Sequence, residues 1–284
     1  MSDLSQVIQS FARMAQSFSD ADLERPWSWW VYDEGVRFAF FRSYEQLRQL
    51  ATHIEVHRQR EGQPVSLAQR ILGQYHCGYR DLQAVLLGVD DGLAQQKPSE
   101  EEWSLRQTLP HIIQAEGSFF AITFYGLERQ RSQDDRPLEM SDAYWEAFWE
   151  GDEFSALKDS GAFSALLAYY DQLHSRVLNA FQEISEAELG APTVFWEEKP
   201  MPVEFRLHRF DSHLRQHTVQ MEKILAQVRG EPSEARRLLR LIYAALAEVE
   251  SSSLGTEALV ETLQQNLAEE IKQRSAEVSA ALSD

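Results

Sequence analysis

Three histidines have the residue type and spacing that metal binding requires. His213 and His217 are four residues apart in a segment with helical periodicity, and His111 lies in a second such segment. Residues i and i+4 of a helix share one face, so both imidazoles of the pair can point at the same ion. A third imidazole from a neighbouring helix would complete a trigonal face of nitrogen ligands. The alternative is that each histidine is a core residue whose ring is hydrogen-bonded to a carbonyl or a carboxylate.

The residues around the histidines indicate that both segments face the interior of a helical bundle. His217 belongs to a stripe of apolar residues at helical spacing: Phe210, Leu214, Met221, Ile224 and Val228. His111 belongs to a stripe of mostly small residues: Ser104, Thr108, Ala115, Ser118 and Ile122. Small residues let a second helix approach closely, or leave space over the imidazole for a ligand. Three histidines on two inward faces favour a metal site over three unrelated core residues.

The order of motifs along the chain resembles that of a known family. The motifs occur in the order Trp103-Ser104, His111, Glu116 and then His213-x-x-x-His217-x-x-Gln220. Over about residues 65 to 228, this order is similar to that of the DinB/YfiT-like superfamily of metal-binding four-helix bundles. The resemblance implies that His111, His213 and His217 bind one divalent ion, which is zinc or nickel in many members and iron in some branches.

The resemblance also implies a fold and an activity. The expected fold is all-α, an up-down-down-up four-helix bundle in which the second helix supplies one ligand and the fourth supplies two. The better understood branches look like enzymes of small thiols: thiol S-transferases, a thiol-dependent isomerase and an iron enzyme of ergothioneine synthesis. The iron branch has a large additional catalytic domain, which residues 233–284 are too short and too helical to supply. We therefore expect a thiol S-transferase-like enzyme that acts on a small thiol and an electrophile.

Two other functions remain open. Three neutral imidazoles leave the charge of an ion uncompensated and a fourth position open, so bound water can serve as the nucleophile of a metal-dependent hydrolase. Alternatively, the bundle is a non-catalytic protein that binds a metal or another small ligand. A sealed pocket over the ion would favour the binding protein, whereas a cleft beside the histidines would favour an enzyme. No catalytic residue is assigned.

Several neighbours of the histidines are candidates for supporting roles. Glu116, Asp211 and His208 are the nearest candidates for a fourth ligand. Asp211 and His208 lie off the ligand stripe and are expected instead to face solvent or to orient a ligand. Gln114 and Gln220 can also hydrogen-bond a ligand imidazole and fix its tautomer.

Three further residues have chemically reactive side chains. His76 and His174 are each either a general base or an ordinary surface residue. Cys77 is the single cysteine, which excludes an internal disulfide and a cysteine-based zinc site. We interpret it as a small buried residue rather than a nucleophile.

The composition excludes several classes of function. The net charge is −18, so the chain would repel a phosphate backbone or an anionic membrane surface. No apolar run approaches the roughly 20 residues that span a bilayer, and the N-terminus lacks the features of a secretory signal. We therefore expect a cytoplasmic protein whose partners are small molecules rather than nucleic acid or membrane.

Chain breakers divide the sequence into three regions. We expect an aromatic-rich helical extension over residues 1–62, the four-helix bundle over 63–230 and a second helical extension over 231–284. The aromatic stretch between Trp27 and Tyr44 either covers the bundle or forms a dimer surface, because such patches are enriched where surfaces bury each other. We expect a homodimer.

Within the bundle, helical stripes and capping signals predict the element boundaries. The first helix begins at Ser66 and the second at Ser104, with Pro110 either in a kink or marking a later start. A long acidic connection over residues 129–160 leads to the third helix, and Gly230 ends the fourth.

Overall fold

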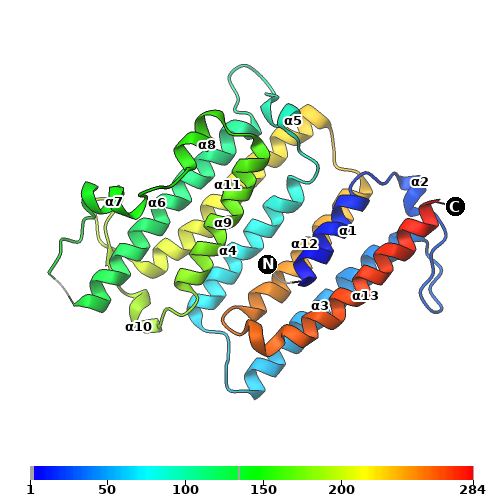
Figure 1. Ribbon diagram of the computed structural model, residues 1–284, viewed down its shortest axis with the longest axis horizontal. Coiled ribbons are helices and arrows are strands. Elements are labelled where there is room, and N and C mark those ends of the chain that lie inside the picture. Colours follow the sequence, from blue (N-terminus) through cyan, green and yellow to red (C-terminus); the bar gives the residue numbers. More distant parts are fainter. Residues whose placement is uncertain (1–2, 134, 284) are drawn as a thin grey trace. The chain divides into compact units, whose positions relative to one another are not determined.

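The chain is all-α, as predicted. The computed structural model describes residues 3–133 and 135–283, in which thirteen helices are joined by loops (Figure 1). The strands in this part of the chain are one antiparallel pair of two residues each, β1 (Pro192–Thr193) and β2 (Met201–Pro202). The up-down-down-up order of the bundle helices stays a prediction. None of the described helices is long and apolar enough to cross a membrane.

The helices form two compact units that interleave along the sequence. The first unit comprises residues 3–65, 76–88 and 230–283, and the second comprises residues 66–75 and 89–229. Helix α4 (Leu67–Val85) therefore contributes its first residues to the second unit and the rest to the first. The segments expected as separate N- and C-terminal extensions belong to one unit.

The first unit is a helical assembly with its own apolar core. Its helices are α1 (Asp3–Ala15), α2 (Asp20–Leu23), α3 (Val36–Arg60), the end of α4, α12 (Glu234–Ser253) and α13 (Glu257–Ser283). Helix α3 packs against α12 and α13, and α1 packs against the same two helices. The apolar faces meet in a buried cluster that includes Phe11, Phe40 and Ile242. The last two helices, α12 and α13, are separated by a short loop between Ser253 and Glu257.

A buried ion pair lies in the first unit and accounts for His76. Arg80 Nε donates a hydrogen bond of 2.7 Å to Glu250, and His76 Nε2 lies 2.8 Å from the same carboxylate. Burial alone would raise the pKa of Glu250, but the charge of Arg80 and the hydrogen bonds lower it to about 2. His76 is therefore a buried partner of this pair rather than a surface residue.

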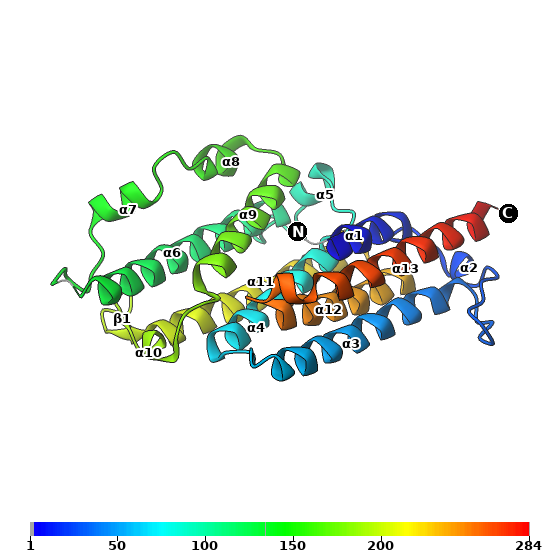
Figure 2. The ribbon, with the colours of Figure 1, turned by 60° about the horizontal axis from the view of Figure 1, so that its bottom comes forward.

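The second unit contains the helices that carry the three histidines. Its elements are the start of α4, α5 (Asp91–Gln95), α6 (Leu105–Ser132), α7 (Asp142–Phe148), α8 (Phe154–Ser160), α9 (Phe163–Phe181), α10 (Glu186–Leu189), the β1–β2 pair and α11 (Val203–Arg229). Helix α6 packs against both α9 and α11. Figure 2 shows α7 and α8 as separate short helices in the connection between α6 and α9.

Capping residues set the starts of the bundle helices. Ser104 caps α6: its hydroxyl accepts from the Gln107 backbone, and the Gln107 side chain accepts from the Ser104 backbone. Ser66 makes the equivalent pair of bonds at the start of α4. Helix α6 therefore begins before Pro110, which lies inside the helix. At the end of α11, Gly230 has a φ of 90°, a conformation that glycine adopts without strain.

Candidate metal centre

The packing of α6 against α11 brings the three predicted histidines together. His111 comes from α6, while His213 and His217 lie one turn apart on α11. The ring centroids are 4.5 to 5.3 Å apart. One nitrogen from each ring lies within 4.8 Å of a nitrogen from both others. This spacing allows the three side chains to hold a metal ion.

The hydrogen bonding of His217 prepares one of its nitrogens for an ion. Its Nδ1 lies 2.8 Å from Oε1 of Gln220, three residues further along α11. Because an amide oxygen only accepts, Nδ1–H donates and Nε2 keeps its lone pair. Ligand imidazoles in metal sites are usually oriented in this way. Gln220 was one of the residues predicted for this role.

His213 is buried in a neutral form with a free nitrogen. Burial, followed by the proximity of His217, His111 and Arg209, lowers its pKa to about 3. Its buried Nδ1 has no hydrogen-bond partner among the described residues. Buried polar atoms without partners are rare, and a nitrogen that binds an ion is one explanation for such an atom. The residues present therefore fit a bound metal.

His111 and its neighbours complete the surroundings of the cluster. Burial, and then the proximity of His217, lowers the pKa of His111, so this ring is also neutral near pH 7. Trp103 packs edge-on against His111 at 5.4 Å, and Phe119 packs edge-on against His213 at 5.7 Å. These aromatic rings reduce access of water to two sides of the cluster.

A surface hollow adjoins the cluster at His217. It has a volume of about 330 Å³ and is lined by Glu101, Glu102, Trp103, His217, Gln220, Lys223 and Ile224. Lys223 Nζ lies 2.7 Å from Glu102 Oε1, so opposite charges meet at its edge. The cluster is thus next to a cleft rather than sealed from the surface.

Glu116 does not join the cluster. Among the described residues, the group of potential metal ligands contains only the three histidines. Glu116 is fully buried and accepts hydrogen bonds from Tyr75 at 2.5 Å and from Tyr170 at 3.1 Å. Burial raises its pKa to about 8, although both hydrogen bonds act in the opposite direction. The structure therefore gives no support to Glu116 as a fourth ligand.

The other candidate neighbours have partners elsewhere or face solvent. Asp211 accepts a hydrogen bond from Arg215, and Gln114 accepts one from Lys158. His208 is exposed. His174 is buried on α9 with its ring 4.6 Å from that of Tyr75, so it is a core residue rather than a surface one.

A buried ion pair lies at the start of α11, and nothing in the sequence could have predicted it. Arg206 is fully buried and donates two hydrogen bonds, of 2.6 and 2.8 Å, to Glu197. The pair fixes the loop between β1 and β2, whose Phe195 packs against Phe119. Phe119 in turn contacts His213. The pair therefore supports one wall of the cluster from a distance.

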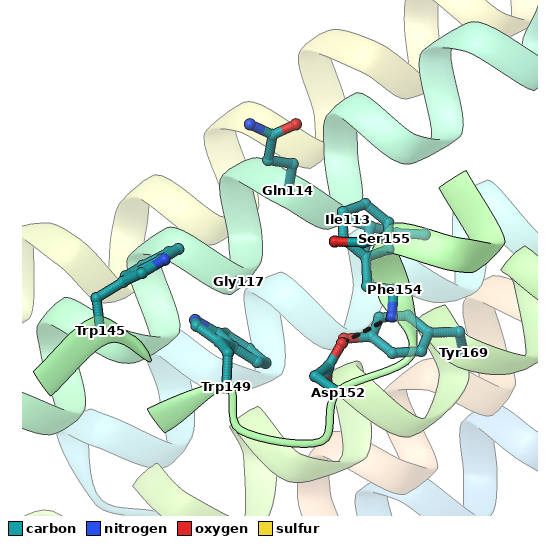
Figure 3. A pocket seen from close by; sticks show the side chains of 9 residues that line it. All are labelled: Ile113, Gln114, Gly117, Trp145, Trp149, Asp152, Phe154, Ser155 and Tyr169. Carbon is teal, nitrogen blue, oxygen red and sulfur yellow. Dashed lines mark hydrogen bonds between the residues drawn. The ribbon is translucent and has the colours of Figure 1, made fainter. Parts of the chain in front are cut away.

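A second hollow lies between α6, the α7–α8 connection and α9. It has a volume of about 170 Å³. Figure 3 shows Trp145 and Trp149 on one side and Phe154 and Tyr169 on the other, with Asp152 between them. Asp152 already accepts hydrogen bonds from the Tyr169 hydroxyl and the Phe154 backbone. This hollow shares no lining residue with the histidine cluster or its cleft.

Fold and site together define an all-α protein with a three-histidine cluster on two packed bundle helices. The sequence model of the DinB superfamily matches residues 74–221, just over half of the chain and including all three histidines. The chain belongs to the DinB superfamily. No curated protein and no solved structure is significantly similar to it.

Proposed function

We propose that this protein is a metal-dependent enzyme that transfers a small thiol to an electrophile. His111, His213 and His217 would hold one divalent ion, with zinc or nickel favoured and iron as an alternative. The observation that supports the proposal is a cluster of three imidazoles beside a cleft. A closed structural site would have a fourth protein ligand, which the described cluster lacks.

The residues of the chain supply binding and orientation. When bound, the ion supplies a Lewis acid that lowers the pKa of a thiol. Gln220 orients His217, and Trp103 and Phe119 limit the access of water. The cleft beside His217 receives the thiol and the electrophile, and its mixed charges suit a polar small molecule. The net charge of −18 supports small-molecule substrates over nucleic acid, and we place the activity in the cytoplasm.

A metal-dependent hydrolase is the second candidate. Glu101 and Glu102 line the same cleft, and a carboxylate there could transfer protons during attack by water. Glu102 is already paired with Lys223, which lowers its availability as a base. A non-catalytic binding protein is the third candidate, and the cleft beside the cluster favours it least.

The test uses cobalt in place of the native ion. Small thiols should change the visible spectrum of the cobalt-loaded protein. One of them should react with a model electrophile faster with loaded wild type than with the His217→Ala variant. The exposed His208→Ala variant is the matched control and should behave as wild type. Thiols that leave the cobalt spectrum unchanged at millimolar concentration would contradict the transferase and favour the other candidates.

A further inference from the structure

The hollow between α6, the α7–α8 connection and α9 has two aromatic walls. Trp145 and Trp149 form one wall and meet edge-on at 6.1 Å. Phe154 and Tyr169 form the opposite wall and stack on each other at 5.4 Å. Figure 3 shows the two walls on either side of Asp152. Because the rings of each wall pack on one another, both walls are formed before any ligand binds.

A glycine in the middle of α6 makes room for the tryptophan wall. Gly117 lines the hollow, and a Cβ atom at this position would lie only 3.3 Å from Cζ2 of Trp149. Glycine lowers the stability of a helix interior relative to alanine. The close approach of the indole to the α6 backbone explains why a side chain is absent here. The shape of the hollow thus depends on a residue that helix stability alone would disfavour.

The indole nitrogen of Trp149 is a buried donor without a hydrogen-bond partner among the described residues. Most buried polar atoms in folded proteins are paired, and a bound water or ligand is one explanation for an exception. Gln114 supplies a second donor at the same hollow. Its Oε1 accepts from Lys158, which leaves Nε2 to donate. The hollow therefore presents donors and suits a ligand that accepts hydrogen bonds.

The charges at the hollow are already matched by groups of the chain. Asp152 accepts hydrogen bonds from the Tyr169 hydroxyl and the Phe154 backbone and lies 3.7 Å from the Arg176 guanidinium. The same guanidinium lies 5.2 Å from the centre of the Trp149 ring. Because Arg176 serves both the carboxylate and the indole, neither group selects a cationic ligand.

We propose that this hollow binds an uncharged, single-ring aromatic molecule that carries a hydrogen-bond acceptor. A cavity of about 150 Å³ holds one benzene ring. The volume of about 170 Å³ therefore suits one ring with a small substituent. The ring lies between the two aromatic walls, and its acceptor takes the hydrogen bond of the Trp149 indole. The hollow shares no lining residue with the histidine cluster, so the proposal does not depend on the metal chemistry.

NMR titration of the full chain with benzamide tests the proposal, because benzamide is an uncharged ring with a carbonyl acceptor. The indole N–H signal that disappears in Trp149→Phe identifies Trp149, and in wild type it should shift downfield at millimolar benzamide. Trp145→Ala, which removes part of one wall, should weaken binding about tenfold. Trp196→Ala is the matched control and should bind as wild type, because Trp196 is 67% exposed and lies outside the hollow.

Chemical variants of the probe test the class of ligand. Cyclohexanecarboxamide lacks aromatic faces, whereas benzylammonium and benzoate each add a charge. All three should bind about fivefold more weakly than benzamide. Equal or tighter binding of any of them would overturn the proposal. So would a Trp149 signal that benzamide does not move, or a Trp145→Ala variant that keeps the wild-type melting temperature and the wild-type affinity.

Discussion

At the scale of residues, the central relation is between the imidazoles of the three-histidine cluster and the groups that orient them. His217 depends on Gln220 for its tautomer, whereas the buried Nδ1 of His213 has no partner in the described structure. One imidazole is thus oriented by a side chain of its own helix and the other by packing against Phe119. The two proposed ligands on α11 should therefore respond differently to substitution of their neighbours.

Gln220→Leu tests the orientation of His217. The variant keeps the size of the side chain but removes the hydrogen bond to Nδ1, so metal affinity should fall about tenfold or more. Competition with a chromophoric chelator measures this affinity. Gln216→Leu, at an exposed position of the same helix, should leave it unchanged. Equal affinities of the two variants would show that the hydrogen bond does not contribute.

Glu116 makes stability dependent on pH. Its pKa is raised from 4.5 to about 8 by burial, so the folded chain holds a proton that the unfolded chain releases at lower pH. Its contribution to stability is therefore fully present below about pH 4.5 and is lost as pH rises toward 8. The melting temperature of wild type should therefore fall over this pH range, and Glu116→Gln should make the fall smaller. Glu102→Gln is the control and should show the same fall of melting temperature with rising pH as wild type. If Glu116→Gln also showed the wild-type fall, burial of Glu116 would not be its cause.

At the scale of elements, the helices and caps were largely predictable from the sequence. Spacing placed His213 and His217 on one face, and the serine at position 104 marked the start of α6. Helices α7 and α8 were not predicted, because each is only seven residues long and the acidic segment around them shows no sustained apolar stripe. The role of Glu116 was also missed. Periodicity shows that a side chain faces inward, but not which tyrosines another helix places opposite it.

The Arg206–Glu197 pair should stabilise the start of α11. Removing one partner of a buried ion pair leaves an uncompensated charge, so Glu197→Ala should lower the free energy of unfolding by about 3 kcal/mol. Urea denaturation measures this change. Glu231→Ala, which breaks the exposed pair with Arg237, is the control and should cost less than about 1 kcal/mol. Similar losses in both variants would show that burial of Arg206 is not the cause.

At the scale of the whole molecule, the sequence did not indicate how the regions combine. Gly62 and Gly230 fall between helices, but chain breakers say nothing about which apolar faces cover one another. The N-terminal helices α1 and α3 pack with the C-terminal helices α12 and α13 into one unit, across more than 150 intervening residues. Such pairing between distant segments depends on tertiary packing, which local periodicity does not encode.

Deletion of residues 1–60 tests the integrity of the first unit. Without α1 and α3, the apolar faces of α12 and α13 lose their cover, so the truncated chain should aggregate or lose cooperative unfolding. Calorimetry and light scattering report these changes. A truncated monomer with the melting temperature of the full chain would show that the four helices do not depend on one another.

The most direct test of the central claim is the metal content of protein purified without an affinity tag. Elemental analysis should find about one divalent ion per chain in wild type and in the exposed His208→Ala variant. The double variant His213→Ala, His217→Ala should contain almost none, because it removes two of the three proposed ligands. A double variant that retained the full metal content would contradict the assignment of the site.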